Sequence, residues 1–206
     1  MTMGPTVFIV DDDAAFLESL TLLLQSVGLK CKGYLSAAEF LRTLDPSLPG
    51  CVILDVCMPS MGGLGLQDKL TKQVDCPPIL FLTGHADVQT ALRAMRQGAV
   101  EFLQKTCREA ELLEAVHRAI AQDSQNRAVR ERSATIRARL SQLTASEREV
   151  FDLVVLGKAN KNIASILGIS QRAVEDRRAK IMRKLGVDNV PALVRFAVEA
   201  GLESGV

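Results

Sequence analysis

The sequence predicts an α/β protein with a doubly wound, five-stranded parallel sheet, followed by a small all-α domain that contains a helix-turn-helix. Two observations predict the sheet. Short apolar runs alternate five times with amphipathic segments in the first part of the chain, and these runs are continuously apolar, as is typical of strands covered on both faces. The all-α domain is predicted because the remaining sequence keeps a helical spacing and has a glycine turn between two short helices.

Length and composition limit the class of protein. The 206 residues are enough for two small domains. No apolar stretch has the length of a membrane span, and the N-terminal residues lack the basic start and apolar core of a signal peptide, so we expect a cytoplasmic protein without membrane contact. The five cysteines form no CxxC pair, which argues against a zinc site or a disulfide framework, and we expect each of them to be a small buried hydrophobic side chain.

The charge is divided unevenly between the two parts of the chain. Residues 1–120 carry 14 acidic and 10 basic side chains, whereas residues 121–206 carry 15 basic and 10 acidic ones. An acidic part joined to a basic part suggests different partners, and the basic part is the one that can bind nucleic acid.

The first two β–α units begin with the run TVFIV at residues 6–10, which predicts a strand because it is rich in β-branched residues. Apolar residues then recur at three- and four-residue spacing over 17–27, and Gly28 ends the predicted helix. Residues 30–34 (KCKGY) fit a second strand. Residues 36–44 begin with SAAE, which has the form of a capping box and predicts a second helix.

The third and fourth strands are predicted at residues 51–55 (CVILD) and 79–83 (ILFLT). Between them, the punctuation MPSMGG at 58–63 predicts a loop, and a helix is expected over 64–72. A further helix is predicted by an apolar face that consists of Val88, Ala91, Leu92 and Met95.

The last β–α unit follows Gly98, which closes the preceding helix. Residues 101–105 (EFLQK) predict the fifth strand, and Leu112, Leu113, Val116 and Ile120 predict the last helix of the sheet domain. Residues 121–143 are polar and carry five arginines, with a few apolar residues at helical spacing. This segment is either a helical extension or a flexible tether, and we favour a partly helical linker. We therefore expect a sheet domain over 1–122, a linker over 123–140 and a helical domain over 141–206.

Polar residues follow the predicted strands at the point where each strand ends. Asp11 and Asp12 follow the first strand, Asp55 ends the third, Thr83 the fourth and Lys105 the fifth. In the flavodoxin-like strand order 2-1-3-4-5 the first and third strands are neighbours, so their carboxylates would converge at one edge of the sheet.

Converging carboxylates predict a hard-oxygen site for Mg²⁺, and a hydroxyl and an ammonium opposite them suit phosphoryl oxygens. The chemistry implied is phosphoryl transfer to a carboxylate, which gives an aspartyl phosphate. Asp55 is the expected nucleophile because it ends the central strand. Any one of these residues alone is more often a helix cap or a solvated loop residue, and Asp13 can cap the helix that begins at Ala14. All of them together at the strand ends favour a functional site.

The basic part begins with TASE at 144–147, a second capping box, whose helix should end at Gly157. A helix-turn-helix is predicted over residues 160–186. Ile163, Ile166 and Leu167 should form the apolar face of its first helix. Gly168 and Ile169 then break that helix, and Ser170 can cap the second helix.

The second helix of this motif has an inward face and a basic outward face. Val174, Ile181 and Leu185 should point inward. The outward residues are expected to be Arg172, Asp176, Ala179, Lys180 and Arg183, with Glu175 on the flank. Six basic and two acidic residues between Ser170 and Gly186 suit a helix in the major groove, where the two acids could accept from cytosine amino groups. A solvated helix face with i,i+4 charge pairs would have a similar composition.

The motifs VDDD, LDVCMP and LTGHAD, together with the strand that ends in Lys105, resemble the receiver domains of two-component response regulators over residues 5 to about 122. The similarity is greatest to the nitrogen-fixation FixJ type, where a Gly-His pair also follows the threonine. The resemblance implies that Asp55 accepts phosphate from a sensor histidine kinase. It also implies that Asp12 and Asp55 bind Mg²⁺ together with the backbone carbonyl of Cys57, and that Asp11 acts on the ion through water. In the same family pattern, Thr83 and Lys105 contact the phosphoryl group, and Phe102 is the aromatic residue that changes position on phosphorylation.

One residue departs from the receiver pattern, which usually has Lys-Pro with a cis bond after the fifth strand. Here the sequence is Lys105-Thr106, and a cis bond before a residue other than proline costs about 2.5–4 kcal/mol. We therefore expect a trans bond and a shifted loop, which would displace Lys105.

The segment LTASEREVFDLVVLGKANKNIASILGIS is similar to the LuxR/GerE-type DNA-binding domain, over about 141–203. That resemblance implies that the helix after Ser170 contacts DNA bases and that the region of Lys161 contacts phosphate. It also implies that the last helix, with Leu193, Val194, Ala197 and Val198, pairs two subunits. The departures from the family are Asn162, Ala173 and Asp176, which bear on base preference and leave the fold unchanged.

The two resemblances imply a phosphorylation-dependent transcription regulator, not a turnover enzyme, although autodephosphorylation is compatible with it. The implied partners are a sensor histidine kinase, promoter DNA, a second copy of the chain that docks through about 87–105, and RNA polymerase. Two rivals stay open. The D-x-D in VDDD also suits a haloacid-dehalogenase phosphatase with Asp11 as nucleophile, and Lys105-Thr106 favours a DNA-binding regulator whose receiver is not phosphorylated.

Overall fold

The computed structural model describes residues 4–73, 75–84 and 87–201. The chain forms two compact units, Met1–Arg127 and Ala128–Val206. The division falls at Arg127, inside the segment predicted as a linker. Residues 123–140 are helical, and the predicted domain limits at 122 and 141 stay a prediction.

The first unit contains one parallel sheet with the strand order β2-β1-β3-β4-β5, which confirms the predicted fold class. In chain order, the strands are β1 (Thr6–Val10), β2 (Lys30–Tyr34), β3 (Gly50–Leu54), β4 (Ile79–Thr83) and β5 (Glu101–Gln104). The third strand begins at Gly50, one residue earlier than predicted. A Cβ atom there would lie 1.8 Å from the carbonyl oxygen of Thr6, so only glycine allows the two backbones to approach this closely.

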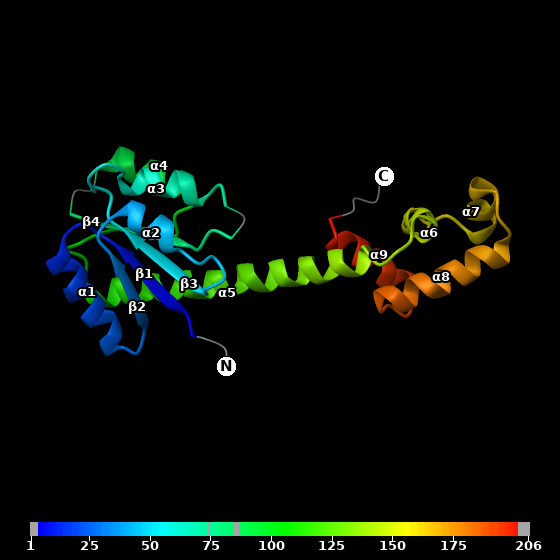
Figure 1. Ribbon diagram of the computed structural model, residues 1–206, viewed down its shortest axis with the longest axis horizontal. Helices are drawn as coiled ribbons and strands as arrows, with labels where there is room; N and C mark the ends of the chain where they lie inside the picture. Colours follow the sequence, from blue (N-terminus) through cyan, green and yellow to red (C-terminus); the bar gives the residue numbers. More distant parts are fainter. Residues whose placement is uncertain (1–3, 74, 85–86, 202–206) are drawn as a thin grey trace. The chain divides into compact units, whose positions relative to one another are not determined.

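Helices cover both faces of this sheet (Figure 1). They are α1 (Ala14–Ser26), α2 (Ala37–Thr43), α3 (Gly63–Leu70), α4 (Val88–Arg96) and α5 (Glu109–Leu140). One apolar core lies between the sheet and α2, α3 and α4, and it includes Phe8, Phe40 and Phe81. A second core lies between the opposite face and α1 with the first part of α5, and it includes Ile9, Leu24 and Val116.

The apolar face predicted for α4 does not point into the core. Val88, Leu92 and Met95 are exposed to 73%, 46% and 43%, and the buried residue of this helix is Ala94. The periodicity therefore predicted the helix correctly, but its largest apolar side chains face solvent. A stripe of this kind suits a contact with another molecule.

The cysteines also differ from the expectation that all of them are buried. Cys51 is buried in β3, and burial raises the pKa of its thiol to about 12. Cys57 is exposed in the loop after β3, and the other three cysteines are partly buried. All five are free thiols.

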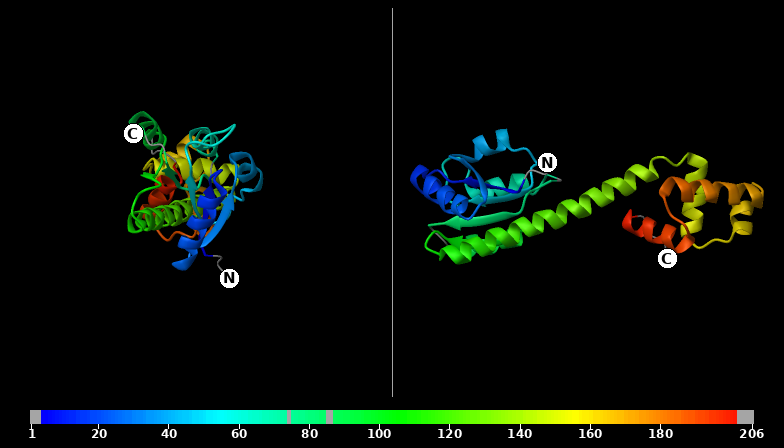
Figure 2. Two further views of the ribbon diagram at one scale, coloured as in Figure 1. Left: turned by 90° about the vertical axis from the view of Figure 1, so that its left-hand side faces the viewer. Right: turned by 90° about the horizontal axis from the view of Figure 1, so that it is seen from below.

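After the end of α5, the described part of the second unit contains α6 (Ala145–Val155), α7 (Asn160–Leu167), α8 (Gln171–Leu185) and α9 (Val190–Glu199). In Figure 2 these helices, coloured yellow to red, form one group. Their shared core also includes Ile136 and Leu140 from the end of α5. The capping box at Thr144 and Glu147 is confirmed, and Gly157 follows the helix as predicted.

The prediction that Ile166 belongs to the buried apolar face of α7 is wrong. Ile163 of α7 is buried and Leu167 packs against the core, but Ile166 is 58% exposed. Ala164 is the buried residue of this helix beside Ile163.

Candidate metal-binding and nucleic-acid-binding sites

The predicted convergence of carboxylates is observed at the carboxyl edge of the sheet. One carboxylate oxygen from each of Asp11, Asp12 and Asp55 lies within 4.8 Å of the other two. The pairing of β1 with β3 aligns Val10 with Leu54, so the following residues Asp11 and Asp55 emerge side by side. Asp11 and Asp55 are almost fully buried, at 2% and 6% exposure, whereas Asp12 is exposed.

Lys105 lies against these carboxylates. Its Nζ is 2.6 Å from Oδ2 of Asp11 and 3.6 Å from Oδ2 of Asp55. Its backbone N–H donates to the carbonyl of Thr83 at 2.9 Å, which fixes the residue at the end of β4. No peptide bond among the described residues is cis, so the predicted trans bond between Lys105 and Thr106 is confirmed. The expected displacement of Lys105 from the site is wrong, because this backbone hydrogen bond keeps the residue beside Asp55.

The charges of the site influence one another. Burial raises the pKa of Asp11, although the hydrogen bonds from Lys105 and from the N–H of Asp13 act in the opposite direction. Burial by itself would lower the pKa of Lys105, but the hydrogen bond and the negative charge of Asp11 outweigh it and the pKa is raised. A single ammonium therefore stands against three carboxyl groups.

The donor set fits a magnesium ion. Oδ1 of Asp55 is buried and has no hydrogen-bond partner within the described part of the chain. A buried carboxylate oxygen without a donor is costly unless a cation or a donor meets it. Three converging carboxylates offer the oxygen ligands that Mg²⁺ prefers, and the remaining negative charge favours a divalent cation.

The loop after β3 folds tightly against the end of that strand. A Cβ atom at Gly63 would lie 2.2 Å from the carbonyl oxygen of Asp55, so glycine is required where α3 begins. Thr83, at the end of the neighbouring strand β4, is fully buried. Phe102 in β5 is partly buried, and its ring stacks on Phe81 with 5.7 Å between centroids. His85 of the predicted Gly-His pair lies outside the described residues.

The helix-turn-helix of the second unit is formed by α7 and α8. Gly168 has a φ of 65° and ends α7, and Ser170 caps α8 by accepting from the N–H of Ala173 at 3.1 Å. Val174, Ile181 and Leu185 are fully buried, as predicted. The residues expected to contact DNA are all exposed: Lys161, Arg172, Glu175, Asp176, Ala179, Lys180 and Arg183.

Two basic residues of α8 make contacts inside the unit that the sequence analysis missed. Lys184 donates to Oε2 of Glu147 at 2.6 Å and to the carbonyl of Gln142, and Arg178 donates to Asn160 of α7. Arg139, at the end of α5, donates to the carbonyl of Leu185 at 3.0 Å. Such pairings carry no periodic signal, because their partners lie far away in the sequence. They fix the orientation of α8.

We expect the stability of this helical unit to fall in acid through Glu147. The hydrogen bond from Lys184, and next the N–H of Thr144, lower the pKa of this carboxyl group. A carboxyl group whose pKa is lower in the folded state stabilises the fold at pH values above its unfolded-state pKa, which is 4.5 for Glu147. This contribution is lost as the pH falls through the folded-state pKa. Glu147→Gln should lower the stability at neutral pH by about 1–2 kcal/mol and remove part of the acid dependence.

Hydrogen exchange of the α6 amides, compared between wild type and variant at each pH, measures this effect. Glu149→Gln is the matched control, because Glu149 is an exposed acid on the same helix. Equal protection of α6 in Glu147→Gln and wild type at neutral pH would contradict the prediction.

The resemblance implies that α9 pairs two subunits, but part of the face concerned is buried in the core of its own unit. Leu193 and Ala197 are buried in the core of their own unit, Val194 is partly buried, and Val198 is 61% exposed. The pairing of two subunits through α9 stays a prediction, and it cannot use all four of these side chains. Leu193 and Ala197 close the core instead, and of the four only Val198 is largely accessible.

A parallel α/β unit with clustered carboxylates and a lysine at its carboxyl edge, joined to a helix-turn-helix unit, defines the class of phosphate-controlled DNA-binding proteins. Comparisons with known proteins agree with this class. Residues 7–117 match the model of the response regulator receiver domain, and residues 141–197 match that of the bacterial regulatory proteins of the luxR family. The chain belongs to the response regulators that join a receiver domain to a LuxR-type DNA-binding domain.

Similar proteins have the same organisation. The chain is 39% identical over 189 residues to the response regulator protein TodT of Pseudomonas putida, with 92% of this chain and 83% of TodT covered. It is 38% identical over 196 residues to the transcriptional regulatory protein FixJ of Azorhizobium caulinodans, with 95% and 93% covered. The solved structure of the response regulator StyR has a TM-score of 0.86 at 38% identity and covers 96% of this chain and all of its own.

The family is one of transcription regulators and not of typical enzymes, and its architecture implies a sensor kinase and DNA as partners. Among the described helices, none combines the length and the apolar character that a bilayer span needs.

Proposed function

We propose that Asp55 of this response regulator accepts a phosphoryl group from a sensor histidine kinase, and that this phosphorylation controls dimerisation and promoter binding in the cytoplasm. One observation carries the proposal: Asp55 is buried beside Asp11 and Asp12, with an unpaired oxygen and with Lys105 in reach. The carboxylate oxygen attacks phosphorus, the bond from phosphorus to the kinase histidine breaks, and the histidine nitrogen leaves with the electron pair.

Each neighbour has a separate role in this transfer. Asp12, Asp55 and the backbone carbonyl of Cys57 would hold Mg²⁺, with Asp11 acting through water. The ion supplies charge neutralisation for the phosphoryl oxygens when it is bound. Lys105 would meet a phosphoryl oxygen at the position where it now faces Oδ2 of Asp55. Asp55 would be phosphorylated once per signal and could lose the group by autodephosphorylation, without acting as a turnover enzyme.

The response to phosphorylation would pass along β4 and β5. The hydroxyl of Thr83 would move toward the phosphoryl group, and Phe102 would turn inward over Phe81. These shifts would alter the surface around residues 87–105. The exposed stripe of Val88, Leu92 and Met95 supports a role for this surface in pairing two copies.

Pairing would place two copies of α8 on two half-sites of promoter DNA. We propose Lys161, Arg172, Lys180 and Arg183 as phosphate contacts, because all are exposed and basic. Glu175, Asp176 and Ala179 would face base edges, where the two acids can accept from cytosine. RNA polymerase is the further partner that a promoter-bound regulator would meet.

The test treats the full chain with an acyl-phosphate donor and Mg²⁺, and measures its mass by light scattering and its affinity for DNA selected from random sequence. We expect the mass to double and the affinity to rise by at least about tenfold, because pairing makes the second half-site contact intramolecular. Asp55→Asn should show neither change. Unchanged mass together with unchanged affinity in the phosphorylated wild type would count against the proposal.

A regulator that is never phosphorylated was favoured by Lys105-Thr106 alone. The structure weakens that alternative, because Lys105 lies beside Asp55 although the bond that follows it is trans.

A further inference from the structure

We propose that Phe16 is a positioning residue of the phosphoryl-acceptor site, whose ring holds the Lys105 ammonium between Asp11 and Asp55. This inference rests on the proposed function, because it concerns the cation that would meet the phosphoryl group. The contact that carries it is short: Nζ of Lys105 lies 4.2 Å from the centroid of the Phe16 ring. An ammonium at this distance from a ring is attracted by the negative face of the π-system.

The first turn of α1 fixes the ring relative to the carboxylates. The side chain of Asp13 caps α1 by accepting from the backbone N–H groups of Ala15 and Phe16, at 3.0 and 3.1 Å. The backbone N–H of Asp13 itself donates to Oδ1 of Asp11 at 3.0 Å. The same short segment therefore orients Asp11 and sets the position of Phe16, so that ring and carboxylate face Lys105 together.

The surroundings of the contact strengthen it. Phe16 and Lys105 line a groove of about 230 Å³ whose other walls include Leu82, Cys107 and Leu112. The side chain of Lys105 is only 20% exposed. A cation that has lost most of its hydration gains more from an aromatic face than one in bulk water.

The geometry also leaves Lys105 able to act on a phosphoryl group. An ammonium has three N–H donors, and here it has three neighbours: Oδ2 of Asp11, Oδ2 of Asp55 and the ring. The ring accepts no conventional hydrogen bond and carries no charge, so it does not compete with a phosphoryl oxygen on Asp55. Without the ring, the ammonium loses a contact that holds it beside Asp55, and it can move toward the groove that Lys105 also lines.

The experiment compares Phe16→Leu, which removes the ring and keeps an apolar side chain, with Phe16→Tyr, which keeps the ring. Full-length proteins react with acetyl phosphate and Mg²⁺ at saturating donor, and the rate of aspartyl-phosphate formation is measured. We expect Phe16→Leu to slow this rate about three- to tenfold and Phe16→Tyr to stay within about twofold of wild type. Leu23→Ala, which removes apolar area from the same groove, is the matched control and should keep the wild-type rate.

A second measurement reads the position of Lys105 directly, through the NMR shifts of its side-chain methylene protons next to Nζ. The ring current should shift them upfield in wild type and Phe16→Tyr, and not in Phe16→Leu. Unshifted protons in wild type, or a Phe16→Tyr variant as slow as Phe16→Leu, would overturn the inference, as would a Phe16→Leu variant that reacts at the wild-type rate. A wild type that takes up no phosphate removes the proposed function instead, and the methylene shifts then decide the positioning of Lys105 alone.

Discussion

The Asp55→Asn variant is expected to take up no phosphoryl group from an acyl-phosphate donor, whereas Asp11→Asn should still be labelled, at least about tenfold more slowly. The two carboxylates differ in whether their oxygen atoms already have hydrogen-bond partners. Asp11 accepts from the N–H of Asp13 through Oδ1 and from Lys105 through Oδ2, so both of its oxygens are engaged. Asp55 has a buried oxygen without a hydrogen-bond partner in the described chain, and it is the better nucleophile.

Intact-protein mass spectrometry after incubation with the donor and Mg²⁺ measures this difference. Asp13→Asn is a suitable control. The side chain of Asp13 caps α1, and asparagine caps a helix equally well. The amount of phosphate bound by this variant should therefore stay within about threefold of wild type. A label that persists in Asp55→Asn and disappears in Asp11→Asn would point to the phosphatase-type nucleophile in VDDD, and would contradict the receiver mechanism.

The site could be predicted because its parts obey a rule that depends on topology alone. Parallel strands end at one edge of a sheet, so residues that directly follow β1, β3 and β5 lie together at that edge once the strand order is known. The positions of Asp11, Asp55 and Lys105 could therefore be predicted without knowing the conformation of any loop. Gly50 shows the limit of this reasoning, because the strand begins where two backbones touch and not where the apolar run begins.

Helix orientation was harder to predict because a hydrophobic stripe has two possible uses. The spacing of Val88, Leu92 and Met95 predicted the helix but not what its apolar face contacts, and in the structure Ala94 packs inward while Val88 is 73% exposed. At α4 a small side chain packs over the sheet, and the larger apolar side chains face solvent. Ile166 of α7 illustrates the same ambiguity.

Contacts between charged side chains that lie far apart in the chain could hardly be predicted from the sequence. The segment from Asp123 to Arg127 is polar and was predicted to be linker. Its i,i+4 acid–base pair was visible, but such pairs are common on solvated helices. Nothing in the sequence shows that Arg127 reaches the loop before β3 and that Asp123 reaches the first residue of that strand. The lysine that binds Glu147 and the ring that faces Lys105 went unnoticed for the same reason.

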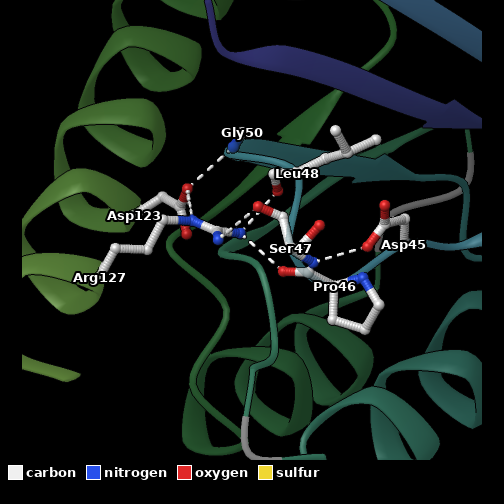
Figure 3. Close-up of polar contacts among 7 residues, drawn as sticks. All are labelled: Asp45, Pro46, Ser47, Leu48, Gly50, Asp123 and Arg127. Atoms are coloured by element: carbon white, nitrogen blue, oxygen red, sulfur yellow. Dashed lines mark hydrogen bonds and ion pairs between the residues drawn. The ribbon is translucent and has the colours of Figure 1, made fainter. Parts of the chain in front are cut away.

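Replacing Arg127 by methionine is expected to destabilise the receiver by about 3–5 kcal/mol, because it leaves a buried carboxylate without its cation. Asp123 is 1% exposed, and its Oδ2 accepts from the N–H of Gly50 and from Nε of Arg127, both at 2.8 Å. The guanidinium of Arg127 also donates to the backbone carbonyls of three consecutive residues, Pro46, Ser47 and Leu48, at 2.9, 2.9 and 2.6 Å (Figure 3).

The chain provides a selective probe for this measurement. Tyr34 is its single tyrosine, it has no tryptophan, and this side chain is buried in the first unit. Tyrosine fluorescence during urea unfolding of the full chain therefore follows the receiver. Arg108→Met is the matched control, because Arg108 is an exposed arginine just before α5, and it should change the stability by less than about 0.5 kcal/mol.

The double variant Asp123→Leu/Arg127→Met separates the charge from the rest of the network. If the cost of Arg127→Met comes from an unpaired buried carboxylate, removing that carboxylate as well should recover at least about half of the lost stability, because the apolar pair needs no desolvated charge. If the cost comes instead from the three loop carbonyls, or if the N–H of Gly50 needs Asp123 as its acceptor, the double variant should be no more stable than the single one. In either case the start of β3 depends on a helix residue that follows it by more than seventy positions, and an Arg127→Met receiver that unfolds at the wild-type urea concentration would contradict that dependence.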